Sequence, residues 1–162
     1  RQRARSRDLP AGDRRMIRVS IDDAPIELAV EVAALEERGA GGVATFTGVV
    51  RGDDGVTALE LEHYPGMTEQ ALIALAEAAT VRWSLLGVTI VHRVGMMVPG
   101  DRIVFIGTAA EHRREALEAC AYLIDRLKTD APFWKRETRG GAASWVEARD
   151  SDAAAAGRWG GD

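Results

Sequence analysis

Residues 128–137 have the sequence KTDAPFWKRE and mark the point where a helix must give way to a strand. Pro132 lacks a backbone N–H donor and disfavours helical angles at Ala131, so the chain turns there. The aromatic residues that follow favour a strand, and this strand carries Lys135. We therefore predict a rigid corner with Lys128 on one side and Lys135 on the other.

Two interpretations of this corner stay open at the level of sequence. A lysine held beside other cations in a partly desolvated place gives up its proton more readily, and it can then serve as a nucleophile or a proton carrier. Alternatively, Lys128 complements the dipole at the C-terminal end of its helix, and Lys135 is a solvated strand residue.

The helix before the corner has an unusual first turn. His112, Arg113 and Arg114 stand where free N–H groups and the helix dipole favour anions and disfavour cations. Helix N–H groups together with two guanidinium groups form a good receptor for a phosphate. The sequence thus predicts anion binding at this helix start. The apolar positions that define the helix are Ala116, Ala119, Cys120, Leu123 and Leu127.

The remaining segments mix strands and helices without regular alternation. Strands are predicted over 16–21, 43–50, 56–63, 87–94, 102–109, 133–138 and 143–148. Helices are predicted over 25–37, 68–83 and 111–128, followed by a short helix through Ala156. We expect 43–50 and 56–63 to form a hairpin through a short polar turn, and 133–138 to pair with 143–148. The predicted fold class is α+β, with mixed or antiparallel sheets and packed helices.

The composition indicates a single domain over residues 16–162. A chain of 162 residues that is 46% hydrophobic can bury a substantial core. Residues 1–15 contain six arginines and two aspartates, and we expect a disordered basic extension there. Such an arm raises the alternative of nucleic-acid binding. No aromatic residue interleaves its arginines, however, so we expect no nucleic-acid partner.

Several classes of site are absent from the sequence pattern. No apolar run reaches about 18 residues and no signal-peptide pattern is present, so we expect no membrane segment and a cytoplasmic protein. The single cysteine, Cys120, excludes an intrachain disulfide, and we interpret it as a buried small hydrophobe rather than a nucleophile. Clustered His, Cys and carboxylate residues at metal-ligand spacing are missing, so neither a metal site nor a cofactor is expected.

Four further residues need interpretation. Arg51, at a strand end, is either solvated or aims its guanidinium group at an anion. His92, inside a strand, is either a structural histidine or a catalytic one. Trp145 and Trp159 are interpreted as packing anchors rather than as residues that stack on a ligand.

Five segments taken together resemble the catalytic, large subunit of molybdopterin synthase. They are TFTGVVR (45–51), LELEHYPGM (59–67), IVHRVG (90–95), HRREALEACAYLIDRLKTDAPFWKRE (112–137) and WVEARDSD (145–152). The resemblance covers nearly everything from Met16 onward. Residues 1–15 match nothing in the family, and the turn over 52–55 is short for it.

The resemblance implies an α/β-hammerhead type of α+β fold and a homodimer at the centre of a heterotetramer. A small ubiquitin-like sulfur-carrier subunit binds each end and carries a thiocarboxylate on its C-terminal diglycine. The family takes sulfur from this thiocarboxylate and inserts two sulfurs into cyclic pyranopterin monophosphate (precursor Z), making the dithiolene of molybdopterin for the molybdenum cofactor. A sulfurtransferase activity is therefore expected. The alternative is a non-catalytic module that binds a phosphate or another anion.

The family's substrate-contacting positions fall on nine residues of this sequence. They are Val49, Val50, Arg51, His112, Arg113, Lys128, Lys135, Arg136 and Glu137. The resemblance implies that the arginines and His112 hold the substrate's phosphate and polar edges. Lys128 is expected nearest the incoming C-terminal glycine, and Lys135 is expected to activate the substrate or transfer protons. By analogy with the family, His112 and Arg113 come from the neighbouring subunit.

Overall fold

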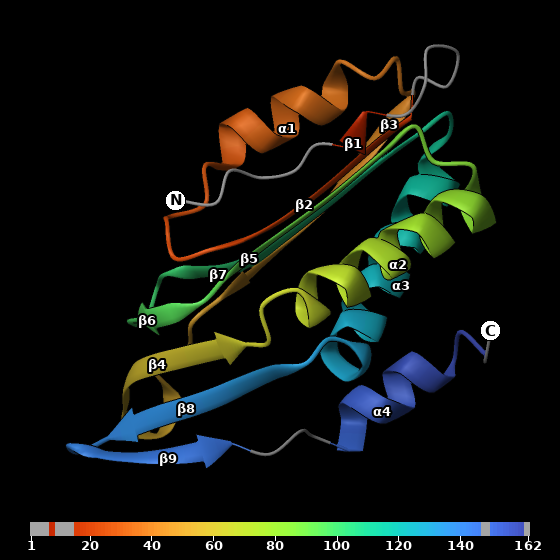
Figure 1. Cartoon of the computed structure of the whole chain (residues 1–162). Helices are drawn as coiled ribbons and strands as arrows, with labels where there is room; N and C mark the ends of the chain where they lie inside the picture. Colours follow the sequence, from red (N-terminus) through yellow and green to blue (C-terminus); the bar gives the residue numbers. More distant parts are fainter. Residues whose placement is uncertain (1–6, 9–14, 147–149, 161–162) are drawn as a thin grey trace.

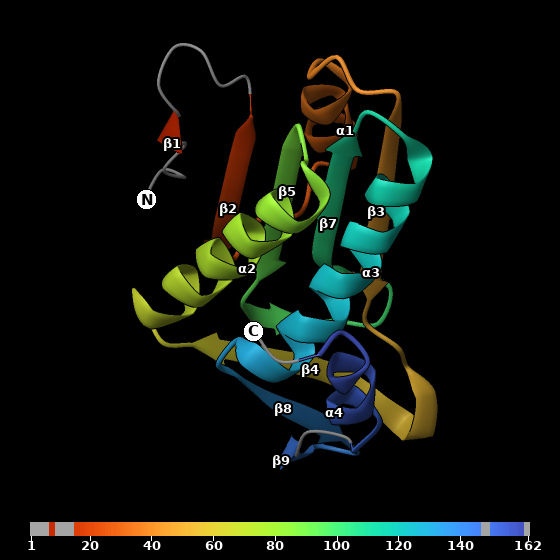
Figure 2. The same cartoon turned by 90° about the vertical axis from the view of Figure 1, so that its right-hand side faces the viewer.

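The computed structural model describes residues 7–8, 15–146 and 150–160, which form two β-sheets with helices packed around the larger one (Figures 1 and 2). The strands are β1 (Arg7–Asp8), β2 (Met16–Asp22), β3 (Gly42–Val49), β4 (Val56–His63), β5 (Gly87–Arg93), β6 (Gly95–Met97), β7 (Arg102–Ala110), β8 (Phe133–Arg139) and β9 (Ala142–Val146). The helices are α1 (Leu28–Glu36), α2 (Met67–Trp83), α3 (Arg113–Asp130) and α4 (Asp150–Gly157), with a short 3₁₀ turn η1 (Asp53–Gly55). This mixture confirms the predicted α+β class.

The larger sheet has the strand order β1-β2-β5-β7-β3. Strands β2 and β5 are parallel, whereas the other neighbours run antiparallel. Helices α2 and α3 lie side by side on one face of this sheet, and α1 covers part of the other face (Figures 1 and 2). None of the helices in the described segments combines the length and apolar content needed to cross a bilayer.

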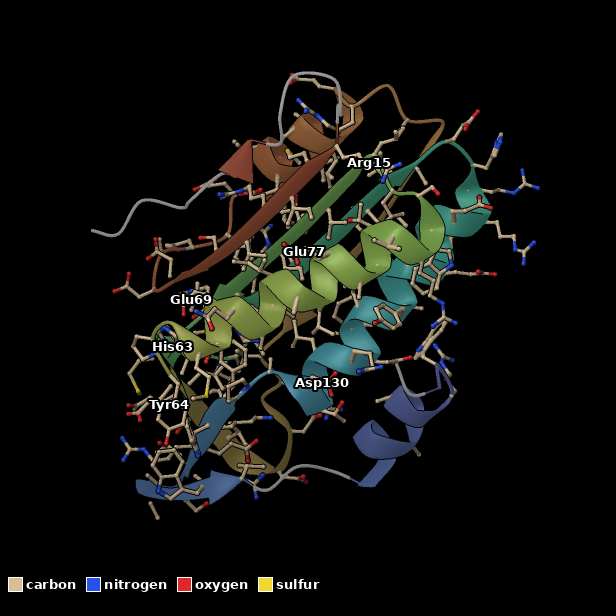
Figure 3. The ribbon with its side chains drawn as sticks, turned by 45° about the vertical axis from the view of Figure 1, so that its right-hand side comes forward. Arg15, His63, Tyr64, Glu69, Glu77 and Asp130 are labelled. Atoms are coloured by element: carbon tan, nitrogen blue, oxygen red, sulfur yellow. The ribbon has the colours of Figure 1, made fainter. Side chains whose placement is uncertain are left out.

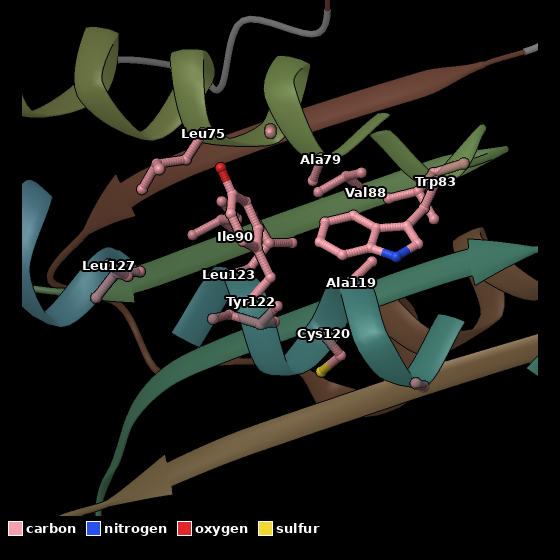
Figure 4. Close-up of a cluster of buried hydrophobic side chains, with 14 of the residues drawn as sticks. Leu75, Ala79, Trp83, Val88, Ile90, Ala119, Cys120, Tyr122, Leu123 and Leu127 are labelled. Carbon is pink, nitrogen blue, oxygen red and sulfur yellow. The ribbon is translucent and has the colours of Figure 1, made fainter. Parts of the chain in front are cut away.

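The main core lies between this sheet and the pair α2 and α3 (Figure 4). Alternate strand residues such as Val88 and Ile90 point toward it, as the period-two geometry of a strand requires. The helices contribute small residues, including Ala76, Ala79 and Ala119, all fully buried. Small side chains let the helix backbones approach the sheet closely. The apolar positions predicted for the helix over 111–128 are all buried in this core, which confirms its predicted spacing.

A second core lies under α1 on the opposite face. Leu35 is fully buried there and packs over Gly107. A Cβ atom at Gly107 would lie 2.2 Å from Leu35 Cδ1, so only glycine fits at this position. Arg18 of β2 makes a two-pronged ion pair with the buried Glu31 of α1, with Nη2 to Oε1 at 2.7 Å and Nε to Oε2 at 2.9 Å. This pair satisfies a carboxylate that would otherwise be costly to bury.

The smaller sheet has the order β6-β4-β8-β9 and stands at one end of the larger sheet (Figure 1). All its neighbouring strands are antiparallel. The predicted pairing of the last two strands is confirmed, with Gly140 and Gly141 making the turn at φ values of 54° and 82°. The residues 147–148 of that prediction lie outside the described segments.

The predicted hairpin of 43–50 with 56–63 is wrong. Strand β3 pairs with β7 in the larger sheet, and β4 pairs with β6 and β8 in the smaller one. The chain between them, which includes η1, carries the backbone from one sheet to the other. An alternating pattern specifies which face of a strand is buried, but it does not specify the strand's partner. The closeness of the two strands in the sequence therefore did not predict their pairing.

Other boundaries differ by a few residues. Helix α1 begins at Leu28 rather than Pro25, and the preceding Ile26 is buried as part of the second core. Helix α3 begins at Arg113, with His112 in an extended N-cap position, and it continues to Asp130. The chain leaves β5 at Arg93 and enters β6 of the other sheet two residues later.

The predicted extension over residues 1–15 is described at three positions. Arg7 and Asp8 form β1, which pairs antiparallel with β2, and Arg15 directly precedes β2. The remaining residues of that segment lie outside the described part of the chain.

Candidate active site

A cavity of about 530 Å³ lies where the two sheets meet the C-terminal end of α3. Side chains from β3, β4, β5, β7, β8 and β9 line it together with the last turns of α3. Most of its lining residues are apolar, including Leu59 and Leu61 from β4 and Val104 from β7, but polar atoms contribute about half of its surface. Six of the nine predicted site residues line this cavity: Val49, Val50, Arg51, Lys128, Lys135 and Glu137.

The predicted lysine corner is one wall of this cavity. Lys128 lies in the last turn of α3, Lys135 lies in β8, and both line the cavity. The turn between them is tied to α2, because the fully buried Thr68 donates its hydroxyl hydrogen to the Pro132 carbonyl at 3.0 Å. The Phe133 N–H closes the turn by donating to the Ala131 carbonyl at 3.0 Å. The positions of both lysines are therefore set by the fold.

These two residues are the only lysines in the sequence. The other 19 of its 21 basic Lys and Arg residues are arginines. Arginine stays protonated in proteins, whereas lysine can lose its proton when its surroundings change. The chain thus places both of its primary-amine side chains in a single cavity. This composition signal was available in the sequence and would have strengthened the lysine prediction.

Strand β8 presents alternate residues to opposite faces of the smaller sheet. Lys135 and Glu137 face the cavity, where Lys135 Nζ lies 3.6 Å from Glu137 Oε1. Arg136 does not line the cavity. Its Nη2 atom instead donates to Glu60 Oε2 at 2.6 Å, and its guanidinium lies 5.6 Å from the ring centroid of Trp145. The structure therefore separates Arg136 from the other predicted residues of β8.

A β-bulge shapes the wall formed by the end of β3. The register with β7 shifts between Gly48 and Val49. A Cβ atom at Gly48 would lie only 2.7 Å from Val104 Cγ1, so a side chain here would disturb the wall. Beyond the bulge, Val50 donates its N–H to the Asp101 carbonyl at 2.9 Å. Bulges commonly redirect side chains near functional sites, and this one delivers Arg51 to the cavity.

Arg51 remains largely exposed at the rim. Its Nε atom lies 3.7 Å from Asp53 Oδ2, and its side chain keeps 65% of its accessible surface. An exposed ion pair of this kind contributes little stability. The guanidinium group can therefore exchange Asp53 for an anionic ligand at low cost.

His92 also lines the cavity, although the predicted substrate contacts did not include it. Its ring is buried, and it stacks on Phe133 with centroids 3.9 Å apart. Nδ1 lies 2.8 Å from the Arg93 carbonyl oxygen. The pKa of His92 is lowered to about 4, mainly by burial and in smaller part by the positive charges of Lys128 and His63, while the contact with the carbonyl offsets part of this shift. His92 is therefore neutral at physiological pH.

His112 and Arg113 lie at the opposite end of α3 from Lys128. A helix rises 1.5 Å per residue, so the 15 residues from Arg113 to Lys128 place them roughly 22 Å apart. His112 lines a different hollow, of about 520 Å³, whose lining also includes Glu111 and Glu118. A single copy of the chain therefore does not bring the two predicted groups together.

The hollow at the start of α3 is a mixed-charge surface. Arg114 donates to Glu118 Oε1 at 3.1 Å, and Trp83 donates its indole N–H to Glu118 Oε2 at 3.0 Å. Trp159 packs against Trp83 at 5.8 Å between ring centroids, which confirms its predicted anchoring role. Trp145, in contrast, keeps 58% of its surface exposed, so it is not a buried anchor.

Cys120 lies in the main core, as predicted. Burial raises the pKa of its thiol to about 11, so the nucleophilic thiolate is scarce at neutral pH. Among the described residues, no group of three or more His, Cys, Asp or Glu side chains is placed to hold a metal ion.

Comparison with known proteins gives a consistent result. The model of the family described as "MoaE protein" matches residues 21–130. A molybdopterin synthase catalytic subunit of Cereibacter sphaeroides is 46% identical over 146 residues, which cover 88% of this chain and 100% of that protein. The catalytic subunit of Escherichia coli is 49% identical over 146 residues, covering 88% of this chain and 97% of that protein.

Solved structures agree with the sequence comparisons. The molybdopterin biosynthesis MoaE protein of Burkholderia ambifaria superposes with a TM-score of 0.77 at 48% identity, covering 89% of this chain and 98% of that one. The molybdopterin synthase structure from Staphylococcus aureus has a TM-score of 0.72 at 32% identity, covering 78% of this chain and 95% of that one. The family model, the relatives and the structures confirm the resemblance seen in the sequence. This chain belongs to the MoaE protein family.

Proposed function

We propose that this chain is the catalytic subunit of a molybdopterin synthase. In this role it transfers sulfur from the C-terminal thiocarboxylate of a small ubiquitin-like partner to cyclic pyranopterin monophosphate. The observation that carries the proposal is the pairing of Lys128 and Lys135 in one cavity of a MoaE-family chain. A cytoplasmic location is part of the same proposal.

The cavity suits an extended peptide that ends in an anion. A diglycine has no side chains to clash with the apolar walls, and its thiocarboxylate carries the negative charge. Two lysine amines in the same cavity supply positive charge that can stabilise such an anion. Arg51 at the rim is available for the substrate's phosphate, because its ion pair with Asp53 is an exposed one.

The two lysines have different surroundings, which supports different roles. Lys135 lies 3.6 Å from Glu137, so this pair can pass protons to and from a bound substrate. Lys128 stands at the end of α3 beside the neutral ring of His92. We assign Lys128 to the incoming C-terminal glycine and Lys135 to substrate activation and proton transfer.

A second copy of the chain completes the site in this proposal. His112 and Arg113 lie roughly 22 Å along α3 from Lys128, so they can act near the lysines only if a neighbouring copy supplies them. The assembly is then a homodimer with a small subunit at each end. A solved Helicobacter pylori structure that is described as a complex of subunits 1 and 2 of molybdopterin-converting factor has the same fold, with a TM-score of 0.71 at 19% identity.

The test is a reconstituted sulfur-transfer assay. The purified chain is mixed with a thiocarboxylated small subunit and cyclic pyranopterin monophosphate, and molybdopterin is measured. Wild-type protein should form molybdopterin, and Lys128→Ala and Lys135→Ala should each lower the rate by at least about 100-fold, the usual scale for a lost proton-transfer group. Arg158→Ala is the control, because Arg158 pairs with Asp125 and does not line the cavity.

The assay also separates catalysis from simple anion binding. A non-catalytic module would bind the partner or the phosphate-bearing ligand without forming molybdopterin. Wild-type turnover in both lysine variants would likewise refute the catalytic assignment, provided that circular dichroism shows the same fold.

A further inference from the structure

The cavity contains one fixed neutral hydrogen-bond acceptor that the proposed mechanism has not used. His92 lies in β5 and is buried, yet it contributes to the cavity wall together with Lys128 and Lys135. Stacking on Phe133, at 3.9 Å and 19° between the ring planes, restricts the orientation of the ring. Phe133 directly follows Pro132, so the same corner that fixes the lysines also fixes this histidine.

The contact at Nδ1 determines which nitrogen carries the proton. A carbonyl oxygen can only accept a hydrogen bond, so the Nδ1 atom 2.8 Å from the Arg93 carbonyl must be the protonated one in the neutral ring. The Nε2 atom is then unprotonated and is an acceptor. Two charged groups also lower the pKa of the ring, namely Lys128 from α3 and His63 from β4.

Lys128 is the natural donor to this acceptor. It lines the same cavity, and its charge reaches the His92 ring strongly enough to disfavour a second positive charge there. His63 is less suited, because its Nε2 lies 3.3 Å from Glu69 Oε1; both residues are labelled in Figure 3. The side chain of His63 also does not line the cavity. We propose that His92 is a positioning residue whose Nε2 atom accepts a hydrogen bond from the Lys128 ammonium group and holds it in the cavity.

This hydrogen bond would restrict the motion of a flexible side chain. Lysine has four rotatable bonds and loses considerable side-chain entropy when its amine is held in one place. A rigid acceptor that stays neutral can orient the ammonium group without cancelling its charge, as a carboxylate would. The contact with His92 therefore does not itself neutralise the positive charge of Lys128. The inference rests on the proposed function for the task that Lys128 performs, but the hydrogen bond itself can be tested without any partner or substrate.

The test uses the fact that the sequence has only two lysines. The chain is labelled at pH 8 with a trace of acetic anhydride, and mass spectrometry of its peptides gives the labelling rate of Lys128 relative to Lys135. Losing the acceptor removes a contact that favours the ammonium form, so more of the reactive free amine is present. The ratio should rise roughly two- to tenfold in His92→Asn and His92→Phe, the range for one lost hydrogen bond.

Three comparisons make this result specific. His92→Asn keeps a donor for the Arg93 carbonyl but has no group at the Nε2 position. His92→Gln can place an amide oxygen near that position, so its labelling ratio should be close to that of the wild type. His63→Gln removes the other histidine near the ring and should leave the ratio unchanged. Melting temperatures show which variants are folded, and His92→Asn decides the matter if His92→Phe does not fold.

The outcomes separate this inference from the proposed function. An unchanged ratio in folded His92→Asn would overturn the inference, as would an equal rise in His92→Gln or His63→Gln. In the sulfur-transfer assay, His92→Asn should lower the turnover rate about tenfold or more, and His92→Gln should recover part of it. If the His92 variants show the labelling effect but the wild-type chain forms no molybdopterin, the proposed function is refuted and the hydrogen bond is still supported.

Discussion

Lys135 and Arg136 are consecutive in β8 but lie on opposite faces of the smaller sheet. Lys135 faces the cavity beside Glu137, whereas Arg136 bonds Glu60 on the outer face at 2.6 Å. Both were expected to contact substrate, and the alternation of a strand allows only one of them to do so from this cavity.

The first prediction concerns this pair. Lys135→Ala should reduce sulfur transfer by at least about 100-fold, because it removes a proton-transfer group. Arg136→Ala should keep at least half of the wild-type rate, because it removes only a partly exposed ion pair. Initial rates of molybdopterin formation measure both effects. If Arg136→Ala lowers the rate of molybdopterin formation as much as Lys135→Ala does, Arg136 takes part in the site.

The second prediction concerns the two ends of α3. If His112 acts in the cavity of a neighbouring copy, His112→Ala and Lys128→Ala chains should complement each other when they are mixed. A mixed dimer then has one site with both lesions and one site with none. Dimers purified through two different affinity tags should show about half of the wild-type rate. Activity no higher than that of either parent would show that His112 does not act in the cavity of a neighbouring copy.

The third prediction concerns acid stability. The pKa of His92 in the folded chain, about 4, lies below its usual 6.5, so the unfolded chain binds this proton first as the pH falls. The stabilising contribution is complete above about pH 6.5 and is lost between there and about pH 4. It amounts to roughly 3 kcal/mol at most. Urea unfolding at pH 7 and pH 4 measures the total loss of stability.

Carboxylates also titrate in this range, so a matched variant is needed. His92→Gln is neutral throughout, and its free energy of unfolding should fall less between pH 7 and pH 4 than that of the wild type. Equal falls in the two proteins would show that His92 accepts a proton as easily in the folded chain as in the unfolded one.

The fourth prediction concerns the single thiol. Cys120 is buried in the main core between α3 and the larger sheet, and burial raises its pKa to about 11 from an ordinary 9.0. The thiolate population is therefore about 100-fold lower than that of an exposed cysteine. Ellman's reagent should modify the native chain at least 100-fold more slowly than the chain unfolded in guanidinium. Rapid modification of the native protein would mean that the core opens readily around α3.

Local sequence patterns were enough to predict most of the elements, the class of fold and the lysine corner. Pro132 must end a helix wherever it stands, and a period of two or of 3.6 residues follows from backbone geometry alone. The long motifs from Thr45 to Arg51 and from His112 to Glu137 were also enough to indicate the family, which the comparisons then confirmed. The opposite directions of Lys135 and Arg136 followed from the same strand geometry and were predictable in principle.

Only the tertiary structure decided which strands pair and which residues meet. Strands β3 and β4 are neighbours in sequence but belong to different sheets, since pairing depends on contacts between residues far apart in the chain. The same long-range packing brings His92 of β5 to the lysine corner and leaves His112 at the far end of α3. A residue's type and spacing specify the chemistry it can perform, but its partners depend on where the whole chain places it.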